Sequence, residues 1–116
     1  MYNMDNKEGD FQMDREQIER ITEMESCLNE SAEAIRDLID AVEKYEAVID
    51  RYYLLREYYT GDAWLKDFEA DEQGLLPDDL KRGVLSEDAV YDLLTDHDSL
   101  MVRLQKIVLK SMEESR

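Results

Sequence analysis

Residues that interrupt or cross-link a protein chain are scarce in this sequence. Its 116 residues include one proline, four glycines and one cysteine. A lone cysteine, Cys27, excludes an internal disulfide framework and fits a reducing compartment. No run of 18 apolar residues occurs, so no membrane-spanning helix is expected. The polar start MYNMDNKEGD does not resemble a secretory signal. We therefore expect a cytoplasmic protein.

Positive charge is also scarce, because 14 Lys and Arg residues stand against 30 Asp and Glu residues, a formal net charge of −16. Such a surface repels the phosphates of nucleic acids and of anionic membranes, so we expect direct binding to neither. Solubility is the simplest explanation for the charge. Because it does not repel basic proteins, an alternative role is that of an acidic decoy that mimics nucleic acid in a basic groove.

The span between Gly9 and Gly61 contains neither glycine nor proline, and its apolar residues follow a helical period. One row with a spacing of seven is Ile21, Leu28, Ile35, Val42 and Ile49. A second row, three positions later, is Met24, Ser31, Leu38, Tyr45, Tyr52 and Tyr59, and a flanking row is Ile18, Ala32, Ile39 and Tyr53. Two rows with this offset are typical of the seam of a coiled coil or an antiparallel bundle.

The pattern predicts an all-α protein with a polar extension over residues 1–13 and one helical domain over residues 14–116. Asp14 and Gln17 resemble a capping box, so we expect the first helix over 14–59, unbroken or kinked near 29–31. Short helical turns over 60–85 connect it to a second helix over 86–113, packed antiparallel against the first. The second helix is too short to cover the whole seam, so the rest should meet a second copy, another protein partner, or the chain itself after a bend. A second copy is the preferred expectation.

The stretch LPDDLKRGVLSED, residues 76–88, has the composition of a chain reversal. Pro77 suits the first position of a short helix over 77–82, and Gly83 suits a left-handed residue that ends it. Ser86 is a predicted N-cap of the last helix, and Leu85 and Val90 are spaced as a hydrophobic staple.

Aromatic and basic residues gather around the central turn. Tyr58, Tyr59 and Trp64 fit core packing, and they also fit an aromatic wall that binds a ligand or a partner. Lys81 and Arg82 are a basic pair in an acidic region, where ion pairs with Asp78 or Asp67 are the simplest expectation. The alternative is an anionic ligand bound by the pair beside the helix start at Ser86. As a second alternative function, a small ligand-binder or enzyme would use Tyr58, Tyr59, Trp64, Asp67, Lys81 and Arg82.

Motifs for metal binding and covalent catalysis are lacking. The acidic cluster Asp67, Glu69, Asp71, Glu72, Asp78 and Asp79 lacks the glycine and glutamate of an EF-hand, although one or two carboxylates could hold Mg²⁺. One histidine and one cysteine cannot form a zinc site. His97 lies on the apolar stripe of the last helix, either as a packed residue or as a general base. We predict no cofactor, no metal and no catalytic residue.

The stretch from Tyr58 to Leu94, with Trp64 and LPDDLKRGVLSED, resembles the bacterial domain-of-unknown-function 4298 family. IERITEME, residues 18–25, is similar to the start of that family, and the resemblance extends from about Ile18 to Ile107. It implies a small, mostly helical, cytoplasmic bacterial protein, and it brings no activity, ligand or site residue. The excess length of the seam and the lack of a recognisable catalytic set predict a non-enzymatic helical module that binds protein.

Overall fold

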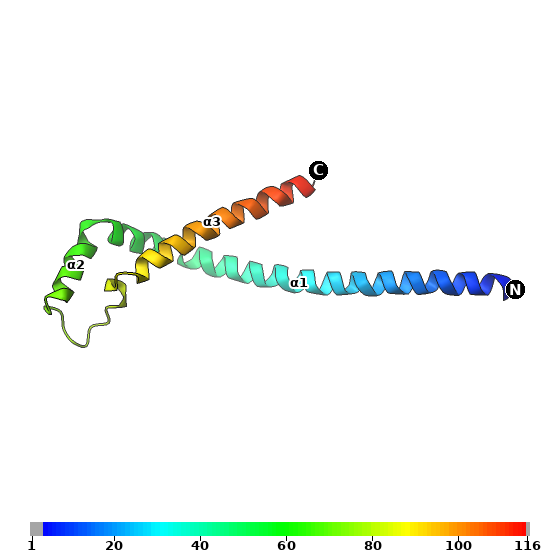
Figure 1. Ribbon diagram of the computed structural model, residues 1–116, viewed down its shortest axis with the longest axis horizontal. Helices are drawn as coiled ribbons and strands as arrows, with labels where there is room; N and C mark the ends of the chain where they lie inside the picture. Colours follow the sequence, from blue (N-terminus) through cyan, green and yellow to red (C-terminus); the bar gives the residue numbers. More distant parts are fainter. Residues whose placement is uncertain (1–3, 116) are drawn as a thin grey trace. The chain divides into compact units, whose positions relative to one another are not determined.

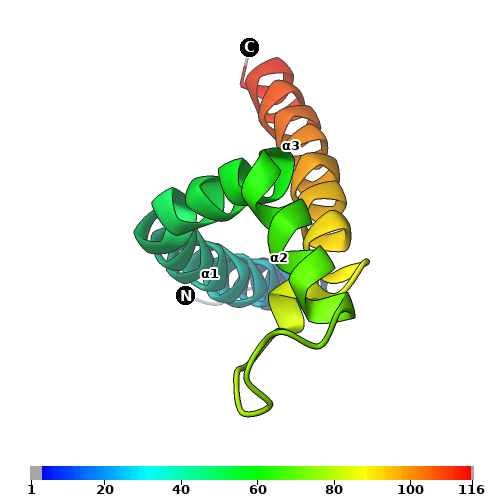
Figure 2. The same ribbon diagram turned by 90° about the vertical axis from the view of Figure 1, so that its left-hand side faces the viewer.

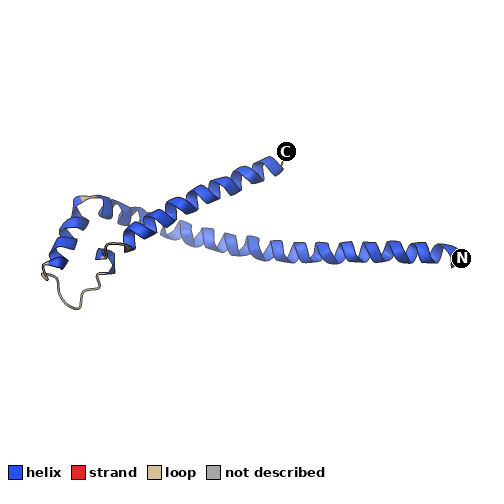
Figure 3. Cartoon of the chain, viewed as in Figure 1, coloured by secondary structure: helices blue, strands red, loops and turns tan. Residues whose placement is uncertain are grey.

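The computed structural model describes the backbone of residues 4–115 and the side chains of residues 14–115. The elements in chain order are α1 (Met4–Thr60), α2 (Asp62–Glu72), the 3-10 helix η1 (Gly83–Leu85) and α3 (Ala89–Glu114). Figure 1 shows this order along the chain, and Figure 3 shows that the described residues form helices and loops without a strand. The predicted all-α class is confirmed.

Helix α1 passes through residues 29–31 without a break, so the continuous form of the predicted helix is confirmed. Its predicted start at Asp14 is wrong, because the helix begins at Met4. Asp14 is therefore inside the helix, where its capping chemistry is not used. Residues 4–13 contain one glycine, Gly9, and no proline. One glycine inside a helix costs only about 1 kcal/mol, so the helix can continue through this segment. Residues 1–3 of the predicted extension lie outside the described residues.

The chain divides between Ala47 and Val48 into two compact units. In the first unit, the side chains on the apolar rows of α1 are largely exposed to solvent. Eight of them are between 45% and 62% exposed: Ile18, Ile21, Met24, Leu28, Ile35, Leu38, Ile39 and Val42. We call these eight side chains the α1 stripe. The predicted division into a polar extension and one domain over 14–116 stays a prediction.

The second unit contains the end of α1 together with α2, η1 and α3. Its core is small, because Leu85 and Val90, 6% and 3% exposed, are the buried apolar side chains among residues 14–115. The close backbone approaches in this unit are those of η1 to α2 and to α3. Helix α3 meets the end of α1 through side chains, and the rings of Tyr52 and His97 stack with centroids 4.2 Å apart. The chain reverses its direction between these two segments, as predicted (Figure 1).

The start of α3 has the predicted chemistry. Ser86 has extended backbone angles, and its Oγ accepts a hydrogen bond from the N–H of Ala89 at 3.2 Å. That contact is the bond of an N-cap to the third helical residue, so the capping role is confirmed although the regular helix is counted from Ala89. Leu85 before the cap and Val90 in the first turn are the two buried side chains, in the positions of a hydrophobic staple.

The segment between α2 and η1 differs from its prediction. Figure 2 shows it as an open loop, and the predicted helix over 77–82 is wrong. The hydrogen bond from Leu80 N to Pro77 O closes one turn at 3.2 Å and no helix follows it. Gly83 belongs to η1, while Gly74 is the residue with a positive φ, 69°, among the described residues. Gly74 ends α2 through bonds from its N to Asp71 O and from Leu75 N to Ala70 O.

Candidate functional site

Gly61 is the single residue that joins α1 to α2 at a sharp corner. Its N–H bonds the carbonyl of Glu57 at 3.1 Å, and a Cβ at this position would lie only 3.1 Å from the same oxygen. A residue without a side chain therefore suits this close turn. The corner brings the last turn of α1 beside the first turns of α2, where four of the predicted site residues lie.

Tyr58 and Asp67 connect the two arms of the corner. The Tyr58 hydroxyl donates a hydrogen bond of 2.6 Å to Oδ2 of Asp67. Desolvation, followed by this hydrogen bond and the negative charge of Asp67, raises the pKa of Tyr58 to about 12. A phenol with a raised pKa is a weak acid and a poor general base at neutral pH. The pair therefore holds the corner together and offers no activated group.

The aromatic side chains at this corner pack against one another. The Trp64 ring lies 4.9 Å from that of Tyr59, edge to face, and 5.1 Å from that of Phe68, stacked. The indole Nε1 donates a hydrogen bond of 2.8 Å to the carbonyl of Val84 in η1. Trp64 thus connects α2 to the segment that carries the core residue Leu85. Its polar atom and its ring both contact other groups of the chain, and the side chain is only half-buried.

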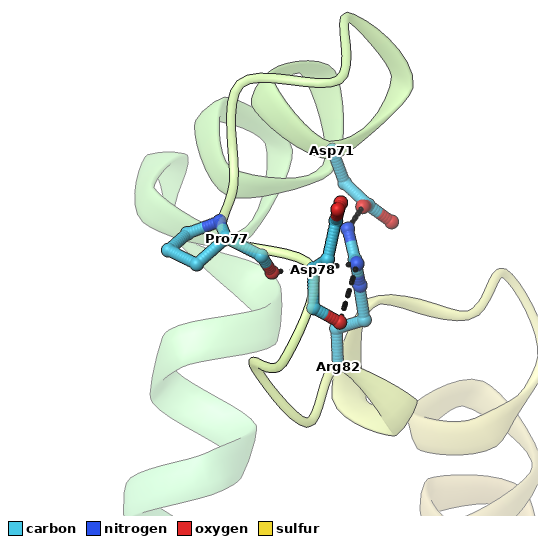
Figure 4. A network of polar contacts seen from close by, with 4 residues as sticks. All are labelled: Asp71, Pro77, Asp78 and Arg82. Atoms are coloured by element: carbon cyan, nitrogen blue, oxygen red, sulfur yellow. Dashed lines mark hydrogen bonds and ion pairs between the residues drawn. The ribbon is translucent and has the colours of Figure 1, made fainter.

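Arg82 holds the loop that follows α2. Its Nη1 forms an ion pair of 2.5 Å with Oδ1 of Asp71, and both side chains are about one-quarter to one-third exposed. Its Nη2 makes longer hydrogen bonds of 3.4 Å and 3.5 Å to the carbonyls of Pro77 and Asp78. Figure 4 shows the guanidinium between these three residues. An ion pair was predicted for the basic pair, but its carboxylate belongs to Asp71 and not to Asp78 or Asp67.

The six predicted site residues do not form one site: four lie at the corner, Arg82 holds the loop, and Lys81 is exposed. Tyr58 with Asp67 and Tyr59 with Trp64 lie together at the corner. Arg82 contacts the end of α2 and the loop, and Lys81 beside it is exposed. Sequence reasoning missed Asp71 as the partner of Arg82, and a spacing of eleven residues across a loop gives no local signal for this pair. A role of these six residues in binding a ligand or partner stays a prediction.

The remaining candidates have ordinary surroundings. The side chain of His97 is 12% exposed, and its Nδ1 lies 3.9 Å from Oδ1 of Asp98, too far for a hydrogen bond. Cys27 is exposed on α1. Within residues 14–115, no group of three or more His, Cys, Asp or Glu side chains has a geometry that could hold a metal ion.

Comparison with known sequence families identifies one match. The profile of the family described as "Domain of unknown function (DUF4298)" matches residues 21–107, about three-quarters of the chain. The chain belongs to this family. The DUF4298 match includes most of the α1 stripe, all of α2 and η1, and α3 as far as Ile107. The corner, the Arg82 loop and the capped start of α3 thus lie inside the DUF4298 region.

Comparisons with curated proteins and with solved structures found no match. In the part of this DUF4298 chain that the structure describes, no helix has a segment both long and apolar enough to cross a membrane.

Proposed function

We propose that this protein is a non-enzymatic helical module that binds another protein chain through the α1 stripe. The observation that carries the proposal is the imbalance between buried and exposed apolar side chains. Two apolar side chains are buried among residues 14–115, whereas twenty-three large ones are exposed. Contiguous exposed apolar surface of this kind is typical of sites that contact protein.

The size of the α1 stripe supports a binding role. Complete burial of a Leu, Ile, Val or Met side chain contributes about 1.5–3 kcal/mol. The eight side chains of the stripe are roughly half-exposed, so half of that contribution is still available from each of them. Together they offer on the order of 6–12 kcal/mol per helix, which is comparable with the roughly 4–15 kcal/mol that association costs in lost freedom.

The shape of the α1 stripe also favours a protein ligand over a small molecule. Tyr58 and Trp64 at the corner, and Arg82 in the loop, already contact protein groups. The α1 stripe, in contrast, extends over 25 residues of a single helix, a length of about 36 Å. A long convex face suits another helix, whereas small ligands bind in concave sites that enclose most of their surface.

Affinity capture from the native host tests the proposal with matched variants. The variant L28E/I35E places two charges in the stripe, and the control T22E/S26E adds two charges outside it on the same helix. We expect the native chain and the control to retain a specific protein. That protein is either a different protein of the host or a differently tagged copy of this chain. The stripe variant should lose it. Equal retention by both variants, or no retained protein, contradicts the proposal.

A further inference from the structure

The register of the α1 stripe can be assigned because α1 is continuous from Met4 to Thr60. In heptad notation, Ile21, Leu28, Ile35 and Val42 occupy position a, and Met24, Ser31 and Leu38 occupy position d. Three of the four a positions carry β-branched residues, and Leu38 is the one leucine among the three d positions. β-Branched residues at a combined with leucine at d favour two-stranded parallel coiled coils. The seam therefore has a definite repeat, and a partner helix of the same repeat would fit it.

The positions that flank the seam change along the helix. Near its start, Arg20 at g and Glu25 at e carry opposite charges, as is common beside a two-stranded seam. From Cys27 onward the flanking positions are small or apolar through Ala41, namely Cys27, Ala32, Ala34, Ile39 and Ala41. The part of the seam flanked by Arg20 and Glu25 therefore suits one partner helix, and these two charges can select which helix that is.

Helix α3 is too short to be the partner of the whole α1 stripe. Beyond His97, which stacks on Tyr52, α3 continues for 17 residues from Asp98 to Glu114. The same number of residues counted back from Tyr52 ends at Ile35. Both helices rise by about 1.5 Å per residue, so the stripe before Ile35 stays beyond the reach of α3 in any arrangement.

We infer that the partner is a second copy of this chain, with the two α1 helices parallel and in register from about Ile18 to Val42. This inference rests on the proposed function and specifies its partner. In a parallel pair, position g of one helix faces position e of the next heptad in the other. Arg20 of each protomer then faces Glu25 of the other, which gives two symmetric ion pairs.

The other charges are compatible with this alignment. Between residues 14 and 47, eight of the eleven acidic residues occupy positions b, c or f, which point away from the seam: Glu16, Glu19, Glu23, Glu30, Glu33, Asp37, Asp40 and Glu43. An antiparallel pair would bring e against e and g against g, and Arg20 would lose Glu25 as its partner. The charge pattern thus selects both a second copy and its direction.

Sedimentation of the purified full-length chain with charge-exchange variants tests the ion pairs. R20E and E25R each place like charges at both g–e contacts, so each should raise the dimer dissociation constant roughly three- to tenfold. The double variant R20E/E25R restores opposite charges and should return the constant to within about twofold of the native value. R36E and E23R make the same charge changes at outward positions and should have little effect.

Disulfide formation tests the direction. In a C27S background, S31C places a thiol at position d, where the two copies face one another only in the parallel, in-register pair. Mild oxidation should link this variant quantitatively, whereas the control E33C, at outward position f, should stay unlinked. Dimers in which E33C links as fast as S31C contradict the alignment.

The outcomes separate this inference from the proposed function. A native chain that sediments as a monomer at about 100 µM overturns the second-copy inference. If affinity capture then recovers a different protein, for example one with a basic amphipathic helix, in a manner that depends on the stripe, the proposed function stands without it. If capture recovers nothing and the chain is monomeric, both are wrong.

Discussion

Arg82 illustrates how a single side chain can replace a helical turn. The predicted helix over 77–82 would have bonded the carbonyls of Pro77 and Asp78 to backbone N–H groups. In the structure the guanidinium of Arg82 contacts both carbonyls and Asp71 as well. A helix of six residues has a costly nucleus and few bonds to offset it, whereas a planar guanidinium with five donors satisfies several acceptors at once. The loop is therefore stabilised by a side chain.

Replacement of Arg82 tests this role. Arg82→Ala should lower the free energy of unfolding by about 1 kcal/mol, since the ion pair is partly exposed and screened by solvent. Arg82→Lys should recover only part of this loss, because an ammonium cannot reproduce the fork of the guanidinium. The neighbouring Lys81→Ala is the control and should change the free energy by less than about 0.5 kcal/mol in urea denaturation. Equal effects at the two positions would contradict the assigned role.

Tyr58 makes stability depend on pH at the alkaline end. Its pKa is raised from the ordinary value of 10.0 to about 12 in the folded chain. Between these values the unfolded chain loses the phenolic proton and the folded chain keeps it, so folding becomes less favourable as pH rises. The stabilising contribution is present below pH 10 and is lost as pH rises through about 12.

Absorbance titration of the phenols measures this shift directly. Tyr58→Phe should remove the ionisation near pH 12, and Asp67→Asn should lower the pKa of Tyr58 towards 10, because the carboxylate that stabilises the neutral phenol is gone. Tyr53→Phe, at an exposed position of the same helix, is the control and should leave that ionisation in place. Circular dichroism confirms that the chain is folded at each pH. A titration of Asp67→Asn identical to that of the native chain would show that the hydrogen bond does not form.

Contacts between residues close in the sequence could be predicted, and contacts between distant residues could not. The N-cap Ser86 was predicted because its partner Ala89 is three residues away. The general form of the Arg82 interaction, an ion pair, was also predicted, but several carboxylates surround it in sequence and the loop geometry selects Asp71. The bond from Trp64 to Val84 crosses twenty residues and ends on a backbone carbonyl, so no residue type marks it in advance.

At the scale of elements, capping and hydrophobic pattern identified α1 and α3, and their exact starts depended on competition between signals. Asp14 and Gln17 had the pattern of a cap, but residues 4–13 continue the helix at little cost, because helix extension adds one hydrogen bond per residue. Gly83 was predicted to be left-handed, whereas Gly74 carries the positive φ because two bonds of a Schellman motif meet there.

The staple at the start of α3 allows a prediction for this element. Leu85→Ala should lower the free energy of unfolding of the second unit by about 2–4 kcal/mol, because Leu85 is 6% exposed and its loss opens a cavity beside Val90. Leu75→Ala is the matched control, since Leu75 also follows α2 in the chain but is 70% exposed. Its effect should be below about 0.5 kcal/mol in urea denaturation. Comparable losses in the two variants would show that Leu85 is not part of a core.

At the scale of the whole molecule, the two units differ in how their apolar residues are covered. The second unit has a small core and several bridging side chains, while the first has helical hydrogen bonds and an exposed stripe. The sequence predicted that the seam exceeds what α3 covers, since helix lengths follow directly from the pattern. It could not identify the partner, because an apolar repeat fits many helices, and only its flanking charges distinguish among them.

Hydrogen exchange measured at two protein concentrations tests whether a second chain covers the α1 stripe. The apolar side chains along residues 18–42 are about half exposed, whereas Leu85 and Val90 are buried, so in the monomer the amides of residues 18–42 should exchange faster than those around Leu85 and Val90. Association adds contacts only along the stripe, and mass action makes this protection depend on concentration. Between about 1 µM and about 100 µM, exchange over residues 18–42 should slow, while exchange around residues 85–94 should stay constant. The stripe variant L28E/I35E should lose the concentration dependence, and the control T22E/S26E should keep it. Protection over residues 18–42 that is strong and equal at both concentrations would mean that intramolecular contacts, and not a second chain, cover the stripe.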